Sequence, residues 1–246
     1  MLKASVLTYI VVLILLSPHE RAREFHEYDI QTDSSVWNLK LNDFINKVTR
    51  KHPQITGGCV TLTSAALANS VIIMALEVSV TKERNAQIIK SVDSLNSLLK
   101  IKKDSLQGLA DLDLIIFKKF LDIYKLPAIT PQQKKIRDSL SNNALIEATR
   151  SPLTAGMVLI NTLRITKESV KYCSNSTVSD IGSGSLLIKG SLDGILLIAR
   201  SNISFLHSRQ KEKLKTILEY EASLGNIEYS KLALEISQRV EHLDSN

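Results

Sequence analysis

The sequence has few of the residues on which disulfide-rich and metal-dependent proteins rely. Only two of its 246 residues are cysteines, Cys59 and Cys173, so neither a disulfide scaffold nor a zinc site built from cysteines is expected. The five histidines form no HExxH motif and no pair spaced four residues apart. This scarcity argues against metal catalysis, and we expect no metal site.

Glycine and proline are also scarce, with nine and five residues respectively, and residues that favour helices dominate the chain. There is no alternating strand pattern, no repeat of 20–50 residues, no P-loop, no GxSxG motif and no strand-GxGxxG-helix arrangement. These absences argue against the common nucleotide-binding and serine-hydrolase classes. They leave an all-α protein.

The composition is that of an ordinary globular protein, with 44% hydrophobic and 23% charged residues. The 31 basic and 25 acidic residues give a net charge of +6. This excess favours anionic partners but falls well short of a nucleic-acid-binding stripe, so we expect no nucleic-acid partner. The lysine pairs at 102–103, 118–119 and 134–135 fit either solvated helix faces or a basic rim for an anionic tail.

The N-terminal segment differs from the rest of the chain. Residues 1–17 resemble a signal peptide, with Lys3 followed by an apolar run that is short for a membrane span, and residues 18–33 read as a polar linker. An export signal, a membrane tether and an upstream extension all fit this pattern, and we favour the extension and a cytoplasmic protein. Residues 34–246 then form the helical domain, and a membrane is a partner only if residues 1–17 are retained.

Hydrophobic periodicity predicts eight helices in that domain. They cover residues 35–51, 59–80, 82–102, 109–125, 131–150, 153–172, 180–205 and 208–243. The second is apolar nearly all round, which places it at the centre of the bundle. Thr130 and Pro131 are typical of a helix start, while Ser151-Pro152 predicts a helix end. Ser179 is the expected N-cap of the seventh helix.

The acidic residue that stands out is Asp113. On a helix it shares one face with Leu109, Ile116 and Phe117, whereas Asp111 lies about 200° round the axis. A carboxylate on a buried face is either a satisfied structural acid or a catalytic acid with a shifted pKa, and the pattern alone leaves both open. Gly57 and Gly58 likewise form either a tight turn or a helix start that accepts a polar ligand.

Several motifs occur in the order found in one known family. The sequence resembles the cyclodeaminase domain of formiminotransferase-cyclodeaminase and its stand-alone bacterial relatives described as methenyltetrahydrofolate cyclohydrolases. The resemblance rests on the following residues, read along the chain: Pro53, Gly57 and Gly58; Ala65 to Met74; Leu109, Asp111, Asp113 and Phe117; Lys125-Leu126-Pro127; Thr130, Pro131 and Arg137; Pro152-Leu153; Asn175 to Asp180; and Asn202. Departures from the family pattern are Ile55, Thr56, Cys59 and Ile198.

The resemblance implies a single bundle of long antiparallel helices that forms a homodimer. It also implies a tetrahydrofolate derivative, with or without a polyglutamate tail, as substrate, and no tightly bound cofactor. It assigns the catalytic acid to Asp113, the residue that the helical pattern also selects. It assigns folate binding to another set of residues, namely Gly57, Gly58, Cys59, Lys125, Asp180 and Asn202.

Three functions follow as hypotheses. The first is cyclodeamination of 5-formiminotetrahydrofolate to 5,10-methenyltetrahydrofolate with release of ammonia. The second is the cyclohydrolase reaction, in which water adds to methenyltetrahydrofolate to give 10-formyltetrahydrofolate. The third is a degenerate, non-catalytic scaffold, which the changed loop residues and Ile198 motivate.

Overall fold

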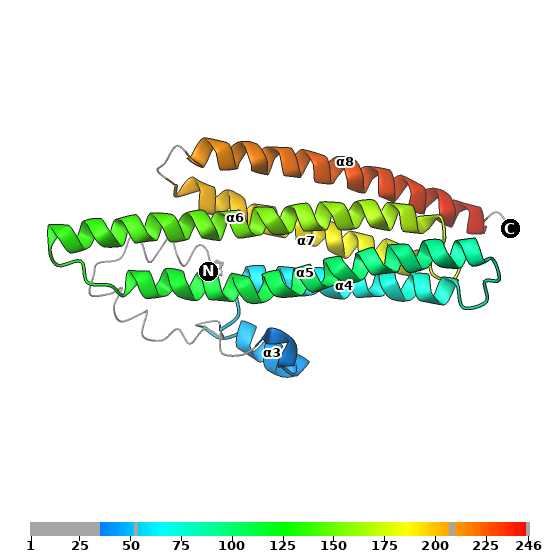
Figure 1. The fold of residues 1–246 in the computed structure, drawn as a ribbon, viewed down its shortest axis with the longest axis horizontal. Coiled ribbons are helices and arrows are strands. Elements are labelled where there is room, and N and C mark those ends of the chain that lie inside the picture. Colours follow the sequence, from blue (N-terminus) through cyan, green and yellow to red (C-terminus); the bar gives the residue numbers. More distant parts are fainter. Residues whose placement is uncertain (1–34, 52–53, 207–209, 245–246) are drawn as a thin grey trace.

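The computed structural model describes residues 35–51, 54–206 and 210–244, and the signal-like segment lies outside this range. The described residues form six α-helices, one short 3-10 helix and no strand, which confirms the all-helical prediction. The elements are η1 Val36–Asn38, α3 Leu41–Val48, α4 Gly57–Ser79, α5 Ala86–Tyr124, α6 Pro131–Val170, α7 Val178–Ser204 and α8 Gln210–Asp244. Figure 1 shows the five long helices side by side in an elongated bundle, with α3 to one side.

The long helices alternate in direction. Helices α4, α5, α6 and α7 each pack against the next, and α7 returns to α4, so these four enclose the core. Helix α8 packs across α6 and α7 and completes an up-and-down bundle of five helices. In the centre, Gly184 of α7 lets α4 approach closely, because a Cβ at that position would lie 2.7 Å from the Ile72 side chain.

Local sequence signals set several helix starts. The Thr56 hydroxyl accepts a hydrogen bond from the Cys59 N–H at the start of α4, and Asn85 caps α5 in the same way. Thr130 and Gln133 form a full capping box at α6, with Pro131 as the first helical residue, which confirms the predicted start there. By contrast, Thr177 rather than Ser179 precedes α7, and its side chain makes no capping bond.

Three predicted helix boundaries are wrong. The predicted helices 82–102 and 109–125 are one helix, α5, and the predicted helices 131–150 and 153–172 are one helix, α6, with Pro152 in its interior. Proline has no N–H to bond the Ala148 carbonyl four residues earlier. The Asn202 amide donates to that carbonyl at 2.7 Å, so α6 continues past the proline. The first predicted helix, 35–51, is instead divided into η1 and α3.

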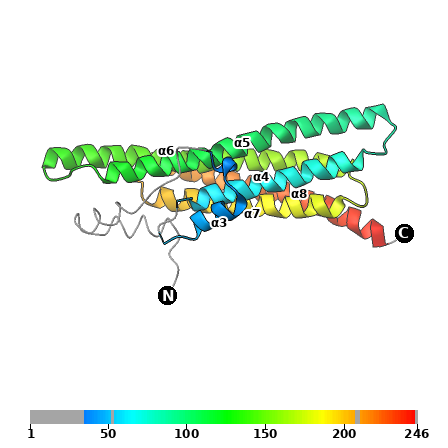
Figure 2. The ribbon, with the colours of Figure 1, turned by 90° about the horizontal axis from the view of Figure 1, so that it is seen from below.

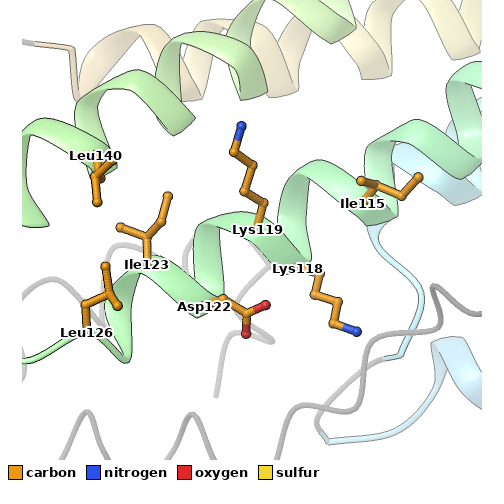
Figure 3. Close-up of a pocket in the computed structure, with 7 residues that line it drawn as sticks. All are labelled: Ile115, Lys118, Lys119, Asp122, Ile123, Leu126 and Leu140. Atoms are coloured by element: carbon orange, nitrogen blue, oxygen red, sulfur yellow. The ribbon is translucent and has the colours of Figure 1, made fainter.

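Helices α5 and α6 extend beyond the others at one end of the bundle, at the left of Figure 1. Their outer parts frame a groove of about 630 Å³, shown in Figure 3. Its lining residues are Ile115, Lys118, Lys119, Asp122, Ile123, Leu126 and Leu140. Lys119 pairs with Glu147 of α6 at 2.7 Å.

Helices α4 and α7 are long and apolar enough to cross a membrane, judged by length and composition alone. About half of each apolar stretch is buried within the bundle. The two helices pack against each other along the bundle, and both ribbons can be followed in Figure 2.

Candidate functional site

The candidate site lies where the N-terminus of α4 meets α5. Asp113 of α5 is partly buried, and its carboxylate lies against the first turn of α4. The Thr56 hydroxyl donates a short hydrogen bond to Asp113 Oδ2. This hydrogen bond holds the Asp113 carboxylate against the N-terminus of α4.

Burial raises the pKa of Asp113 above its ordinary value. The Thr56 hydroxyl and the Cys59 backbone N–H oppose this rise, because each stabilises the charged form. Burial is the largest of these effects, so the carboxyl group keeps its proton to higher pH than an exposed aspartate. An acid whose pKa is raised in this way is suited to donate a proton to a substrate.

Gly58 is the residue that makes room for this carboxylate. A Cβ at Gly58 would lie 2.5 Å from Asp113 Oδ1 and 2.7 Å from Oδ2, closer than any side chain permits. A Cβ at Gly57 would meet no atom of the described residues within 4 Å. The two glycines are therefore not equivalent, since only the second is needed for the approach of Asp113.

Cys59 follows directly and is fully buried. Burial, and then the negative charge of Asp113, raise the pKa of its thiol to about 12. A thiol with so high a pKa is a weak nucleophile, so Cys59 contributes packing and its backbone N–H to this site.

Asp111 has a separate role. Its carboxylate accepts a hydrogen bond from the Val36 N–H at 3.0 Å and so holds η1 against α5. The helical geometry predicted that the two acids would not share a site, and the structure shows them bonded to different elements.

Comparison with known proteins identifies the family to which the chain belongs. The sequence model of the family described as formiminotransferase-cyclodeaminase matches residues 40–219, which include Asp113 and the N-terminus of α4. The chain belongs to the formiminotransferase-cyclodeaminase family. The resemblance seen in the sequence is thus confirmed at the level of the family.

Two relatives illustrate the match. Formimidoyltransferase-cyclodeaminase from Gallus gallus is 23% identical over 200 residues, which are 81% of this chain and 36% of that protein. The chain therefore spans about a third of the length of this curated relative. The crystal structure of formiminotetrahydrofolate cyclodeaminase from Thermotoga maritima superposes with a TM-score of 0.72 at 18% identity, covering 83% of this chain and 99% of that one. This second match shows that the fold is shared.

The other residues assigned from the family resemblance lie farther from Asp113. Lys125 is twelve residues along α5, about 18 Å at the rise of a helix, and it pairs with Asp122 at 3.2 Å. Asp180 stands in the first turn of α7, beside the C-terminal end of α4, where the Ser79 and Thr177 hydroxyls lie 2.8 Å apart. That end is about 30 Å from Gly58 along α4.

Asn202 lies near the same end of the bundle as Asp113, but it is 5% exposed and its amide nitrogen bonds Ala148. Ile198, one turn earlier on α7, is half-buried and packs against the core. Within the described residues, the structure thus brings Gly58 and Cys59 to Asp113 and leaves Lys125, Asp180 and Asn202 outside this contact. Their folate-binding roles remain predictions.

The sequence analysis missed Thr56 as a site residue. It names Thr56 only as a departure from the family pattern. Thr56 is both the N-cap of α4 and the hydrogen-bond donor to Asp113. A threonine directly before two glycines and an apolar helix is a helix-start signal, which could have placed its hydroxyl at this end of α4.

Proposed function

We propose that this chain is a formiminotetrahydrofolate cyclodeaminase that uses Asp113 as its general acid. Membership of the family supports the class of substrate, a tetrahydrofolate carrying a one-carbon unit. The observation that carries the residue assignment is the buried carboxyl group of Asp113, fitted against Gly58 and bonded by Thr56.

The chemistry requires a proton donor. N10 of the folate attacks the formimino carbon attached to N5, which closes the five-membered ring. N10 loses its proton and the imino nitrogen gains one, so that nitrogen becomes an amino group. The C–N bond to the amino group then breaks, and nitrogen leaves as ammonia only after it has been protonated. The raised pKa keeps the proton on Asp113 to higher pH than on an exposed aspartate, so Asp113 is suited to give this proton. The product is 5,10-methenyltetrahydrofolate.

The test follows absorbance at the 5,10-methenyltetrahydrofolate band after 5-formiminotetrahydrofolate is added to the full chain and to Asp113→Asn. We expect a rise with the wild type and a loss of about 100-fold or more with the variant, the usual effect of removing a general acid. Asparagine mimics the protonated form that burial already favours, so the variant is expected to fold as well as the wild type.

Asp104→Asn is the matched control, because Asp104 lies on the same helix with a side chain that is 71% exposed. It should keep the wild-type rate. If Asp113→Asn is as active as this control, the assignment of the acid is wrong. A fall in absorbance from methenyltetrahydrofolate, above the spontaneous rate, with no response to the formimino substrate would identify a cyclohydrolase instead. No response to either substrate would favour the scaffold hypothesis.

A further inference from the structure

The groove between the outer parts of α5 and α6, shown in Figure 3, begins beside the point where the described chain starts. The Val36 N–H donates to Asp111 of α5, and the Trp37 indole N–H donates to the Gln107 carbonyl at 3.2 Å. Ile115, which lines the groove, lies four residues after Asp111 on the same face of α5. The polypeptide that precedes η1 therefore reaches α5 at one end of this groove.

The groove follows that face of α5 and combines apolar with charged side chains. Lys118 and Asp122 follow Ile115 at the spacing of successive helix turns, and both are exposed. Four of the lining residues are apolar, namely Ile115, Ile123, Leu126 and Leu140. Leu126 and Leu140 are each 40% exposed. A segment that carries both apolar and acidic side chains suits such a surface.

The charge of this end of the bundle is complementary to that of the chain before η1. Residues 115–140 hold six basic and two acidic side chains, and thus most of the net charge of +6. Residues 24–33 hold four acidic residues and no lysine or arginine. The same ten residues include Phe25, Tyr28 and Ile30, which can cover apolar surface.

We propose that residues 24–33 bind in this groove of their own chain. The lengths agree. Leu126 is fifteen residues beyond Asp111, about 22 Å along α5. An extended chain covers about 3.3 Å per residue, so the seven residues before Val36 reach Leu126. In this register Asp33 is level with Lys118, where opposite charges meet.

The glutamate tail of a folate is also anionic, but it fits this groove less well. Ile115 is two residues after Asp113, and the two side chains therefore point about 200° apart round α5. A substrate whose one-carbon unit meets Asp113 would have to pass round the helix to enter the groove. A segment joined to Val36 enters it directly.

The bound segment would extend the packing of the N-terminal part of the fold onto α5. Residues 24–33 lead into η1, and η1 leads through α3 to Thr56, which bonds Asp113. Binding in the groove would thus hold η1 in place from its N-terminal side.

Photo-cross-linking in the full chain tests the proposal, with benzoylphenylalanine in place of Leu126. The intact mass first verifies that residues 1–33 are present. We expect a cross-link within one chain to residues 24–33, localised by fragmentation of the tryptic peptide 24–40. The same probe at Ile101 is the control. Ile101 is also on α5 and is 58% exposed, but it precedes Asp111, on the side of η1 away from the groove, and should give no such cross-link.

Charge reversal tests the register with the probe kept at Leu126. Lys118→Glu would place a carboxylate level with Asp33 and should lower the cross-link yield about twofold or more. Asp33→Lys should have the same effect, and the two changes together should restore the yield. Lys231→Glu on α8, at a side chain that is 57% exposed, is the matched control and should leave the yield unchanged. Circular dichroism checks that each variant remains helical.

Several results would overturn the proposal. A cross-link from Leu126 that joins two chains would assign the groove to a second copy. Attachment of added tetrahydrofolate to the probe, in place of residues 24–33, would assign the groove to the substrate. Equal cross-linking from Leu126 and Ile101 would show that the segment does not select the groove. None of these measurements depends on turnover, so they remain decisive if the proposed reaction fails.

Discussion

Glu221 of α8 provides a quantitative test of how this bundle responds to pH. It is 2% exposed, and its Oε2 has no hydrogen-bond partner among the residues that the structure describes. The carboxylate is wedged against Gly156 of α6, where a Cβ would collide with it, and near Leu196 of α7. A buried acid without a partner favours its neutral form. Burial accordingly raises the pKa of Glu221 from 4.5 to about 7.

The size of the effect follows from those two values. The difference between a pKa of about 7 when folded and 4.5 when unfolded, at roughly 1.4 kcal/mol for each pH unit, gives about 3.5 kcal/mol. Because the folded state binds the proton more tightly, this stabilisation is complete below pH 4.5. It is lost as the pH rises through about 7. Most of the change falls between pH 5 and pH 8.

The assay is urea unfolding, followed by circular dichroism, of the wild type and Glu221→Gln from pH 5 to pH 8. We expect the free energy of unfolding of the variant, relative to wild type, to increase by about 2 to 3 kcal/mol over this range. Using the difference between the two proteins cancels the titration of Asp113, whose pKa is also raised. Glu219→Gln is the control, since that side chain is 62% exposed. Equal pH dependence in wild type and Glu221→Gln would refute the reasoning.

Three further predictions concern the candidate site and the interrupted helix. Gly58→Ala should displace the Asp113 carboxylate and lower cyclodeaminase activity about tenfold or more. Gly108→Ala is the control and should keep the wild-type rate, because a Cβ there meets no atom of the described residues within 4 Å. Thr56→Val removes a donor to the charged carboxylate, so the upper pH limit of activity should move higher, and Thr56→Ser should leave it in place. Asn202→Leu should leave the Ala148 carbonyl without a hydrogen-bond donor. The free energy of unfolding, measured in urea, should then fall by about 1 to 3 kcal/mol. Turnover of the same variant is measured separately to detect any role of Asn202 in binding.

Much of the fold could be predicted because its determinants are local. The all-helical class follows from apolar residues spaced at 3.6 and from the scarcity of glycine and proline. The start of α6 at Thr130 and Pro131 is encoded by a side chain that bonds the backbone three residues away. Asp113 was also identifiable, because a lone acid on an apolar helix face stands out without any knowledge of what packs against it.

Other features depend on contacts between distant segments. The sequence indicates a helix end at Pro152, but the end does not form, because Asn202, 54 residues from Ala148, supplies the missing donor. Thr56 reaches Asp113 only because the N-terminus of α4 packs against the side of α5. Glu221 looks like any glutamate on an amphipathic helix, and its burial is decided by Gly156, on a helix that is not adjacent in sequence.

The sequence alone therefore determined the all-helical class, the family and the choice of Asp113 as the candidate acid, since short-range periodicity, capping and motif order require no knowledge of packing. The tertiary structure decided which helices continue, which carboxylates lose water and which residues meet at Asp113. The physical reason is that the pKa of an acid and the satisfaction of a carbonyl depend on groups brought within a few ångströms by packing. Those groups can lie anywhere along the chain.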